Sequence, residues 1–121
     1  MNVILDTQVF IWLDSDPARL SPAARARIND PASRLLLSVA SVWEMVIKVG
    51  TGKLTLRADV EVLVTDQLTR NPIVLLPVNV PEAFAVGRLP PIHRDPFDRM
   101  LVAHAQVLNA VLLTADATVR Q

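Results

Sequence analysis

Two short apolar runs of the chain each end at an aspartate, and this pairing is the first indication of chemistry in the sequence. Val3-Ile4-Leu5 leads into Asp6 near the start, and the run from Val111 to Ala115 leads into Asp116 near the end. If both runs are strands of one parallel sheet, the two carboxylates lie at its carboxyl edge, where open α/β sheets place their ligands. The sequence therefore predicts an acidic site at that edge.

Two further acids extend this pair, because Glu44 and Asp98 lie near the starts of expected helices. The chain has no cysteine, and its two histidines do not have the spacing of metal ligands, so a zinc site is not expected. Close carboxylates repel one another unless a cation neutralises them. Three or four of them at one edge therefore predict Mg²⁺ or Mn²⁺, held by a few carboxylates and several waters. The residues do not decide between one ion and two.

Each acid also has a purely structural explanation. Asp6 and Asp116 could cap the helical turns that follow them, and Asp98 could complement a helix dipole three residues after the expected cap. Glu44 stands three residues after Ser41, which is the spacing of a capping box. Taken singly, each of these explanations suffices. Taken together, they would require four acids to meet at one end of one sheet by coincidence.

Basic residues flank two of the acids. Arg94 and Arg99 lie on either side of Asp98, and either could hold a substrate phosphate through a bidentate contact, with an ion pair to a neighbouring aspartate as the alternative. Lys48 follows Glu44 by one helical turn, which is a favourable spacing for an ion pair.

The histidines and tryptophans give weaker indications. His93 lies in a polar loop and could touch a phosphate, whereas His104 is expected to be a partly buried or surface residue on a different face of its helix from Asp98. Trp12 and Trp43 are expected to be core residues or anchors for a partner, rather than platforms for stacked bases.

The elements that must position these residues follow an alternating pattern, in which short β-type runs are separated by helical stretches. This pattern is typical of a parallel α/β sheet. Strands are expected at 2–6, 35–37, 73–76 and 111–114. Helices are expected at about 9–13, 22–29, 41–50, 60–69, 81–86 and 96–109.

Composition restricts the class of protein. A length of 121 residues suits a single domain spanning 1–121, and 51% apolar residues are enough for a core without disulfides. Twelve basic and twelve acidic side chains cancel, which argues against a protein that coats nucleic acid by bulk charge but not against an enzyme that contacts a few phosphates. A mean hydropathy of +0.36 in so small a domain indicates exposed apolar surface for a partner or for self-association.

The chain shows no sign of export or membrane insertion. Its first residues lack the positive region of a signal peptide and soon meet Asp6. Its longest apolar stretch, 35–49, is too short and too often interrupted by polar residues to span a bilayer. We therefore expect a cytoplasmic protein.

Five segments together resemble the PIN-domain family, and more narrowly the VapC-type ribonuclease toxins of bacterial type II toxin–antitoxin modules. In chain order they are 3–7 (VILDT), 37–44 (LSVASVWE), 47–54, 89–101 (LPPIHRDPFDRML) and 113–116 (LTAD). The resemblance covers essentially the whole chain, and the segment from His93 to Leu101 is its most specific part.

The resemblance implies a PIN-like parallel sheet of four or five short strands flanked by helices, and a Mg²⁺- or Mn²⁺-dependent ribonuclease. The metal-binding and catalytic acids of the family match four residues here: Asp6, Glu44, Asp98 and Asp116. Polar residues that line the same pocket match Ser38 and Thr114, which, with Arg94 and Arg99, are the candidates for substrate binding.

The resemblance also implies partners. It implies a homodimer, and a cognate antitoxin that lays a peptide along an apolar groove beside the active site. Relatives usually continue into a further strand beyond the position of Asp116, whereas this sequence ends at Gln121, so either that edge of the sheet is open or the sequence is truncated there.

We therefore predict a metal-dependent endoribonuclease, the toxin of a type II toxin–antitoxin module, which hydrolyses RNA phosphodiester bonds. Asp6, Asp98 and Asp116 would bind Mg²⁺ or Mn²⁺ directly or through water, and Glu44 would bind the metal or orient the attacking water. The alternative is a non-catalytic module of the same fold that uses its apolar groove only to hold a partner. The sequence does not name the RNA or its cleavage site.

Overall fold

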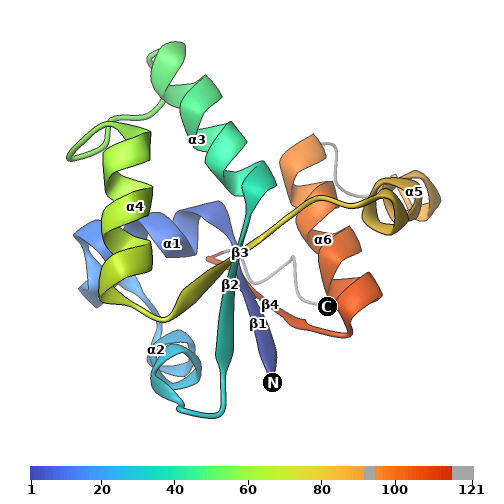
Figure 1. The fold of residues 1–121 in the computed structure, drawn as a ribbon, viewed down its shortest axis with the longest axis horizontal. Coiled ribbons are helices and arrows are strands. Elements are labelled where there is room, and N and C mark those ends of the chain that lie inside the picture. The colour runs from blue at the N-terminus through green and yellow to red at the C-terminus, as the bar shows by residue number, and fades with distance from the viewer. Residues whose placement is uncertain (92–94, 116–121) are drawn as a thin grey trace.

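A four-stranded parallel sheet forms the centre of the protein (Figure 1). The structure is a computed structural model, and it describes residues 1–91 and 95–115. The strands are β1 (Asn2–Leu5), β2 (Arg34–Ser38), β3 (Ile73–Leu76) and β4 (Val111–Leu113), in the order β3-β2-β1-β4. The predicted parallel α/β sheet flanked by helices is confirmed.

The register aligns the carboxyl ends of β1, β2 and β4 at one edge of the sheet. Leu5 of β1 lies opposite Leu37 of β2 on one side and Leu113 of β4 on the other. The residues that follow these positions, Asp6 and Ser38 among them, therefore meet at the carboxyl edge of the sheet. The first strand tolerates a continuous apolar run because both of its faces are covered, and Val3, Ile4 and Leu5 are completely buried.

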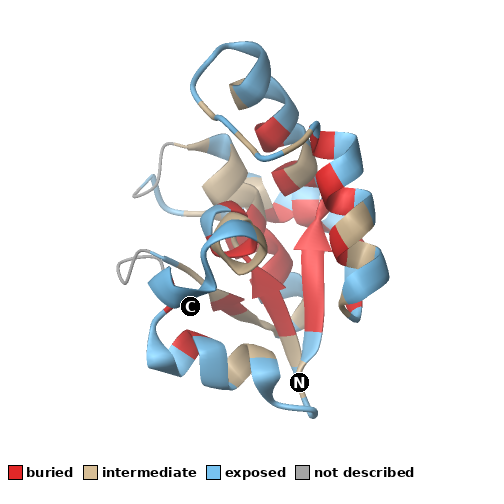
Figure 2. Cartoon of the chain, turned by 90° about the vertical axis from the view of Figure 1, so that its left-hand side faces the viewer, coloured by how far each residue is buried: buried red, intermediate tan, exposed pale blue. Residues whose placement is uncertain are grey.

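Helices cover both faces of the sheet. On one side lie α1 (Thr7–Ser15), α2 (Pro22–Asn29), α3 (Val39–Gly50) and α4 (Val60–Arg70), and on the other lie α5 (Val80–Arg88) and α6 (Pro96–Leu108), as Figure 1 shows. A 3₁₀ turn, η1 (Pro17–Arg19), follows α1. Successive strand residues alternate between the two layers: Val3 and Leu5 pack with α1 to α4, whereas Ile4 packs against α6. Figure 2 shows the buried residues gathered on the strands and on the helix faces turned toward them.

The third helix begins earlier than the sequence suggested. It starts at Val39, because the Ser38 hydroxyl caps it by accepting a hydrogen bond from the Ala40 N–H at 3.0 Å. Ser41 is buried inside the helix, and its hydroxyl finds no hydrogen-bond partner among the described residues. The capping box of Ser41 and Glu44 was therefore a wrong interpretation. Glu44 lies in the second turn, where a capping role is not available to it.

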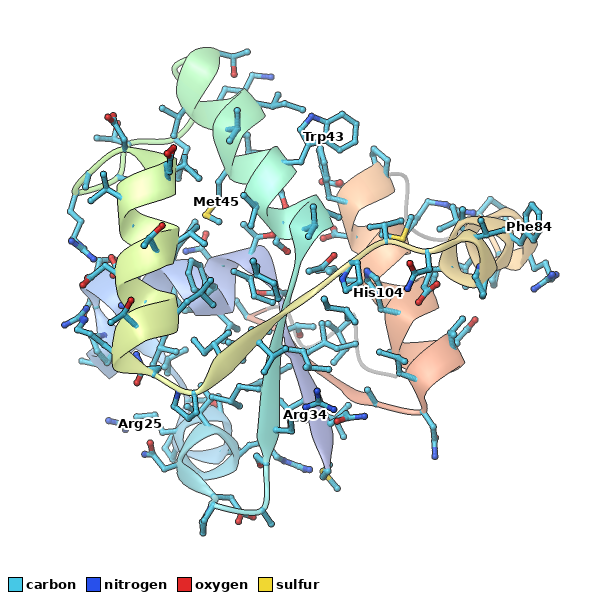
Figure 3. All side chains as sticks on the ribbon, viewed as in Figure 1. Arg25, Arg34, Trp43, Met45, Phe84 and His104 are labelled. Atoms are coloured by element: carbon cyan, nitrogen blue, oxygen red, sulfur yellow. The ribbon has the colours of Figure 1, made fainter. Side chains whose placement is uncertain are left out.

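The structure also corrects the predicted burial of His104. It was expected to be partly buried or on the surface, but it is completely buried between α6 and the sheet (Figure 3). Its Nε2 atom lies 2.9 Å from the Ser38 hydroxyl, and its Nδ1 atom lies 3.8 Å from a carboxylate oxygen of Glu82. Burial lowers the pKa of His104, and the buried carboxylate of Glu82 opposes this effect. The imidazole is tolerated in the core because Ser38 gives it a polar partner.

A polar cluster fastens the far end of α1 to α4. The Asp14 side chain is 1% exposed and accepts hydrogen bonds from Arg57 Nε and Nη2, each at 2.8 Å, and from Gln67 Nε2 at 2.6 Å. Arg57 lies in the connection between α3 and α4 and also pairs with Asp66 at 2.6 Å. The Arg57 guanidinium lowers the pKa of Asp14 below its ordinary value. This cluster therefore holds the connection that runs past the carboxyl edge of the sheet.

No helix in the described ranges is long and apolar enough to cross a membrane.

Candidate active site

A pocket of about 270 Å³ opens at the carboxyl edge of the sheet. We call it the acidic pocket, and its lining includes Asp6, Thr7, Glu44, Lys48, Lys53, Asp95 and Asp98. It brings together three of the four acids predicted from the sequence: one follows β1, one lies on α3 and one lies in the first turn of α6. The fourth acid, Asp116, lies outside the described residues.

Asp6 has both a structural role and a place in the pocket. Its Oδ1 atom accepts a hydrogen bond from the Val9 N–H at 2.7 Å and so caps α1, as one of the sequence interpretations expected. Its Oδ2 atom accepts a weaker bond from the Ala115 N–H at 3.3 Å, which ties β1 to the segment after β4. Burial raises the pKa of Asp6, and the negative charge of Glu44 adds to this, while backbone hydrogen bonds to the carboxylate oppose it. A cation in the pocket would favour the ionised form.

Glu44 is a buried carboxylate whose two oxygens both have partners. Oε1 accepts a hydrogen bond from the Thr7 hydroxyl at 2.6 Å, and Oε2 accepts one from the Lys48 ammonium at 2.5 Å. The ion pair of Glu44 and Lys48 that the helical spacing predicted is thus confirmed. The hydrogen bond to Glu44 raises the pKa of Lys48, and the charges of Asp95 and Asp98 add to this effect.

Asp98 reaches the pocket because α6 begins beside it. Asp95 caps this helix, since its Oδ1 atom accepts hydrogen bonds from the Phe97 N–H at 2.8 Å and from the Asp98 N–H at 3.4 Å. Pro96 occupies the first position of the helix, where its missing N–H costs nothing. Asp98 is half-buried in the first helical turn, so the favourable interaction with the helix dipole and the position in the pocket are compatible.

Two of the residues predicted to bind substrate, Ser38 and Thr114, are described by the structure and lie outside the acidic pocket. Ser38 is completely buried, with its hydroxyl engaged by His104 and by the Ala40 N–H. Thr114 lines a separate cavity of about 450 Å³ between β4 and α2. Neither belongs to the lining of the acidic pocket.

Arg99 folds back onto α5 and the turn that follows it. Its guanidinium donates hydrogen bonds to three backbone oxygens, at 2.8 Å, 3.3 Å and 3.0 Å: those of Val86, Leu89 and Pro90. The arginine thus stabilises the end of α5 against the start of α6. Arg94, the other basic candidate, lies outside the described residues.

Several lining residues were not among the sequence candidates for the site, and the charged or hydroxyl-bearing ones are Thr7, Lys48, Lys53 and Asp95. Thr7 directly follows Asp6, and Asp95 stands three residues before Asp98, so proximity to the acids in the sequence could have pointed to both. Lys53 follows a turn at Gly52, whose φ of 74° is in the left-handed region that favours glycine. That turn returns the chain toward the pocket from the end of α3.

The donor chemistry of the pocket suits a hard divalent ion, because its acids offer only oxygen ligands. Within 1–91 and 95–115, however, no three carboxylate or imidazole groups approach closely enough to hold one ion together. The ammonium of Lys48 is bonded to Glu44 and attracted by Asp95 and Asp98. The acids therefore fit a divalent ion in the type of ligand they offer, and the Lys48 ammonium occupies one of their oxygens.

An apolar groove adjoins the acidic pocket. It has a volume of about 490 Å³ and is lined by residues that include Val39, Trp43, Val78, Val86, Phe97 and Met100. Trp43 is 62% exposed (Figure 3) and meets Phe97 edge to face, with ring centroids 5.5 Å apart. The two cavities are neighbours because Trp43 precedes Glu44 on α3 and Phe97 precedes Asp98 on α6. The exposed apolar surface that the mean hydropathy indicated therefore includes a groove beside the acids.

Comparison with known proteins identifies a matching family and several solved structures of similar fold. A family model for the PIN domain matches residues 3–121. Among solved structures, a chain of VapBC2 from Rickettsia felis, bound to a DNA fragment from their promoter, is similar with a TM-score of 0.70 and 16% identity, covering 98% of this chain and 90% of that one. A chain of VapBC-1 from nontypeable Haemophilus influenzae is similar with a TM-score of 0.64 and 25% identity, covering 98% of this chain and 89% of that one. A search of curated proteins found no match.

Proposed function

The chain belongs to the PIN domain family, and from this premise we propose that it is a metal-dependent endoribonuclease, the VapC-type toxin of a type II toxin–antitoxin module. The observation that carries the proposal is the meeting of Asp6, Glu44 and Asp98 in one pocket at the carboxyl edge of the sheet. PIN domains are generally nucleases, and the two solved structures named above are VapBC toxin–antitoxin complexes. We place this activity in the cytoplasm, with RNA, an antitoxin and a second copy of the chain as partners.

The acids would divide the chemistry among them. Asp6 and Asp98, with Asp116 from the end of the chain, would hold Mg²⁺ or Mn²⁺. Such an ion, when bound, lowers the pKa of a coordinated water and stabilises the charge that develops on the phosphoryl group. Glu44 would bind the ion or orient the attacking water, and the hydroxyl of Thr7 holds the Glu44 carboxylate in place for this role.

The direct test is RNA cleavage with and without divalent ions. The purified chain should cleave RNA with Mg²⁺ or Mn²⁺, lose the activity when EDTA removes the ion, and recover it when Mn²⁺ is added in excess. Mn²⁺ should also raise the melting temperature, because an ion that binds only the folded state stabilises it, by about 2.7 kcal/mol at one hundred times its Kd. A chain that cleaves no RNA and melts at the same temperature with and without millimolar Mn²⁺ would instead be the non-catalytic binding module.

The apolar groove supports the proposed antitoxin partner. Trp43→Ala should weaken binding of the antitoxin by at least about 30-fold, since an exposed aromatic anchor in an apolar groove commonly contributes about 2 kcal/mol. Isothermal titration calorimetry with the purified antitoxin measures this loss. Val62→Ala is the matched control, because Val62 is an exposed apolar residue (56%) on α4 outside the groove, and it should bind as the wild type does. Equal affinities of the two variants would exclude the groove as the antitoxin site.

A further inference from the structure

We propose that Lys48 is the resident counter-ion of the acidic pocket, and that a divalent ion must displace its ammonium from Glu44 in order to bind. The inference rests on the metal-dependent function proposed above and adds a residue that regulates the same site. It starts from the contacts of one carboxylate and one ammonium group.

Both carboxylate oxygens of Glu44 have partners in the protein. Glu44 is 6% exposed, Thr7 donates a hydrogen bond to one of its oxygens, and Lys48 donates one to the other at 2.5 Å. A buried carboxylate without a partner is costly, so the Lys48 ammonium stabilises the Glu44 carboxylate. A divalent ion that approaches the same oxygen meets a positive charge already in contact with it.

The ammonium also lies where the acids of the two helices act together. Glu44 pairs with it along α3, and Asp95 and Asp98 at the start of α6, which line the same pocket, attract it through their charges. A metal ion bridging α3 and α6 would occupy the same electrostatic minimum.

Lys48 is able to leave without disturbing the fold. Its side chain is 39% exposed, whereas that of Glu44 is 7% exposed, so the lysine can rotate toward water on its flexible stem while the glutamate remains in place. The exchange replaces one positive partner of Glu44 by another, and the buried carboxylate stays neutralised throughout. The consequence is an affinity for the ion that is lower than the acids alone would give.

The test is the affinity for Mn²⁺, measured by isothermal titration calorimetry on the wild type, Lys48→Met and Lys53→Met. Methionine keeps a long apolar stem and removes the charge. Lys53 is the matched control, because it lines the same pocket but its ammonium makes no hydrogen bond or ion pair with a described residue. Lys48→Met should bind Mn²⁺ at least about tenfold more tightly, because an ammonium group and a divalent ion a few ångströms apart repel one another strongly. Lys53→Met should gain less than about threefold, since Lys53 is exposed and its charge is screened by water and salt.

A second measurement uses the wild type and does not depend on a variant. In a Mg²⁺ titration followed by NMR, the side-chain Cε–Hε signal of Lys48 should move with the same midpoint as the backbone amide of Asp98, and that of Lys53 should move less. A fixed Lys48 signal, equal Mn²⁺ affinities of the wild type and Lys48→Met, or an equal gain in both lysine variants would each overturn the inference. If none of the three proteins binds Mn²⁺, both the inference and the proposed metal-dependent function fail. If all three bind Mn²⁺ equally well, only the inference about Lys48 fails.

Discussion

Asp6→Asn should reduce RNA cleavage by at least about 100-fold, because even residues that only support metal ligands commonly contribute 10- to 100-fold. The same change should leave the free energy of unfolding unchanged or slightly raised. Asparagine is as good a helix cap as aspartate, and the ionised form of Asp6 is disfavoured by burial and by Glu44. Cleavage of a labelled RNA and urea denaturation of the same preparation measure the two quantities.

A matched pair of variants separates chemistry from folding at this position. Asp6→Ala should lose the same activity and, in addition, about 1 kcal/mol of stability, because the Val9 N–H loses its cap. Asp98→Asn should resemble Asp6→Asn in activity, since Asp98 lines the same pocket. Activity of Asp6→Asn within a few-fold of the wild type would contradict the role assigned to this carboxylate.

Asp14→Ala should have the largest effect on stability among the polar residues outside the pocket, lowering the free energy of unfolding by about 2 to 3 kcal/mol at pH 7. The change removes a buried acceptor and leaves the amide of Gln67, itself 1% exposed, without the partner that it has at 2.6 Å. Denaturation in urea measures the loss. Asp66→Ala is the control, because Asp66 pairs with the same arginine but its side chain is 36% exposed, and its loss should be less than about 1 kcal/mol.

The pH dependence of this difference follows from the lowered pKa of Asp14. The folded state favours the ionised carboxylate, so its contribution is complete above the pKa of about 3.9 expected for the unfolded chain. The contribution is lost as the pH falls through the lower pKa of the folded state. The wild type and Asp14→Ala should therefore differ fully at pH 7 and converge in stability below pH 4. A difference that persists unchanged in acid would show that packing, rather than charge, explains the effect of the substitution.

The sheet and the meeting of the acids could be predicted because they depend on local patterns. Apolar runs that end at Asp6 and at Ser38 mark strands buried on both faces, and the parallel order then brings their ends together. The pair of Glu44 and Lys48 follows from helical spacing alone. In each case, the residues that interact are near in sequence or related by the regular geometry of one element.

The start of α3 was mispredicted because both Ser38 and Ser41 are acceptable caps when only the local sequence is considered. His104, 66 residues further along the chain, hydrogen-bonds to the Ser38 hydroxyl, which therefore belongs to the core as well as to the helix start. The role of Arg99 was hidden for a similar reason. Its partners are main-chain oxygens, which carry no residue-specific signal in a sequence.

The alternation of the groove and the acidic pocket along the same two helices has an evolutionary consequence. Neighbouring residues on a helix point about 100° apart, so Trp43 and Glu44 face different cavities, as do Phe97 and Asp98. A substitution at 43 or 97 can therefore change which protein is recognised and leave the acids untouched. If the groove holds a protein partner as proposed, variants of such a gene can diverge in their choice of partner while the acidic pocket stays unchanged.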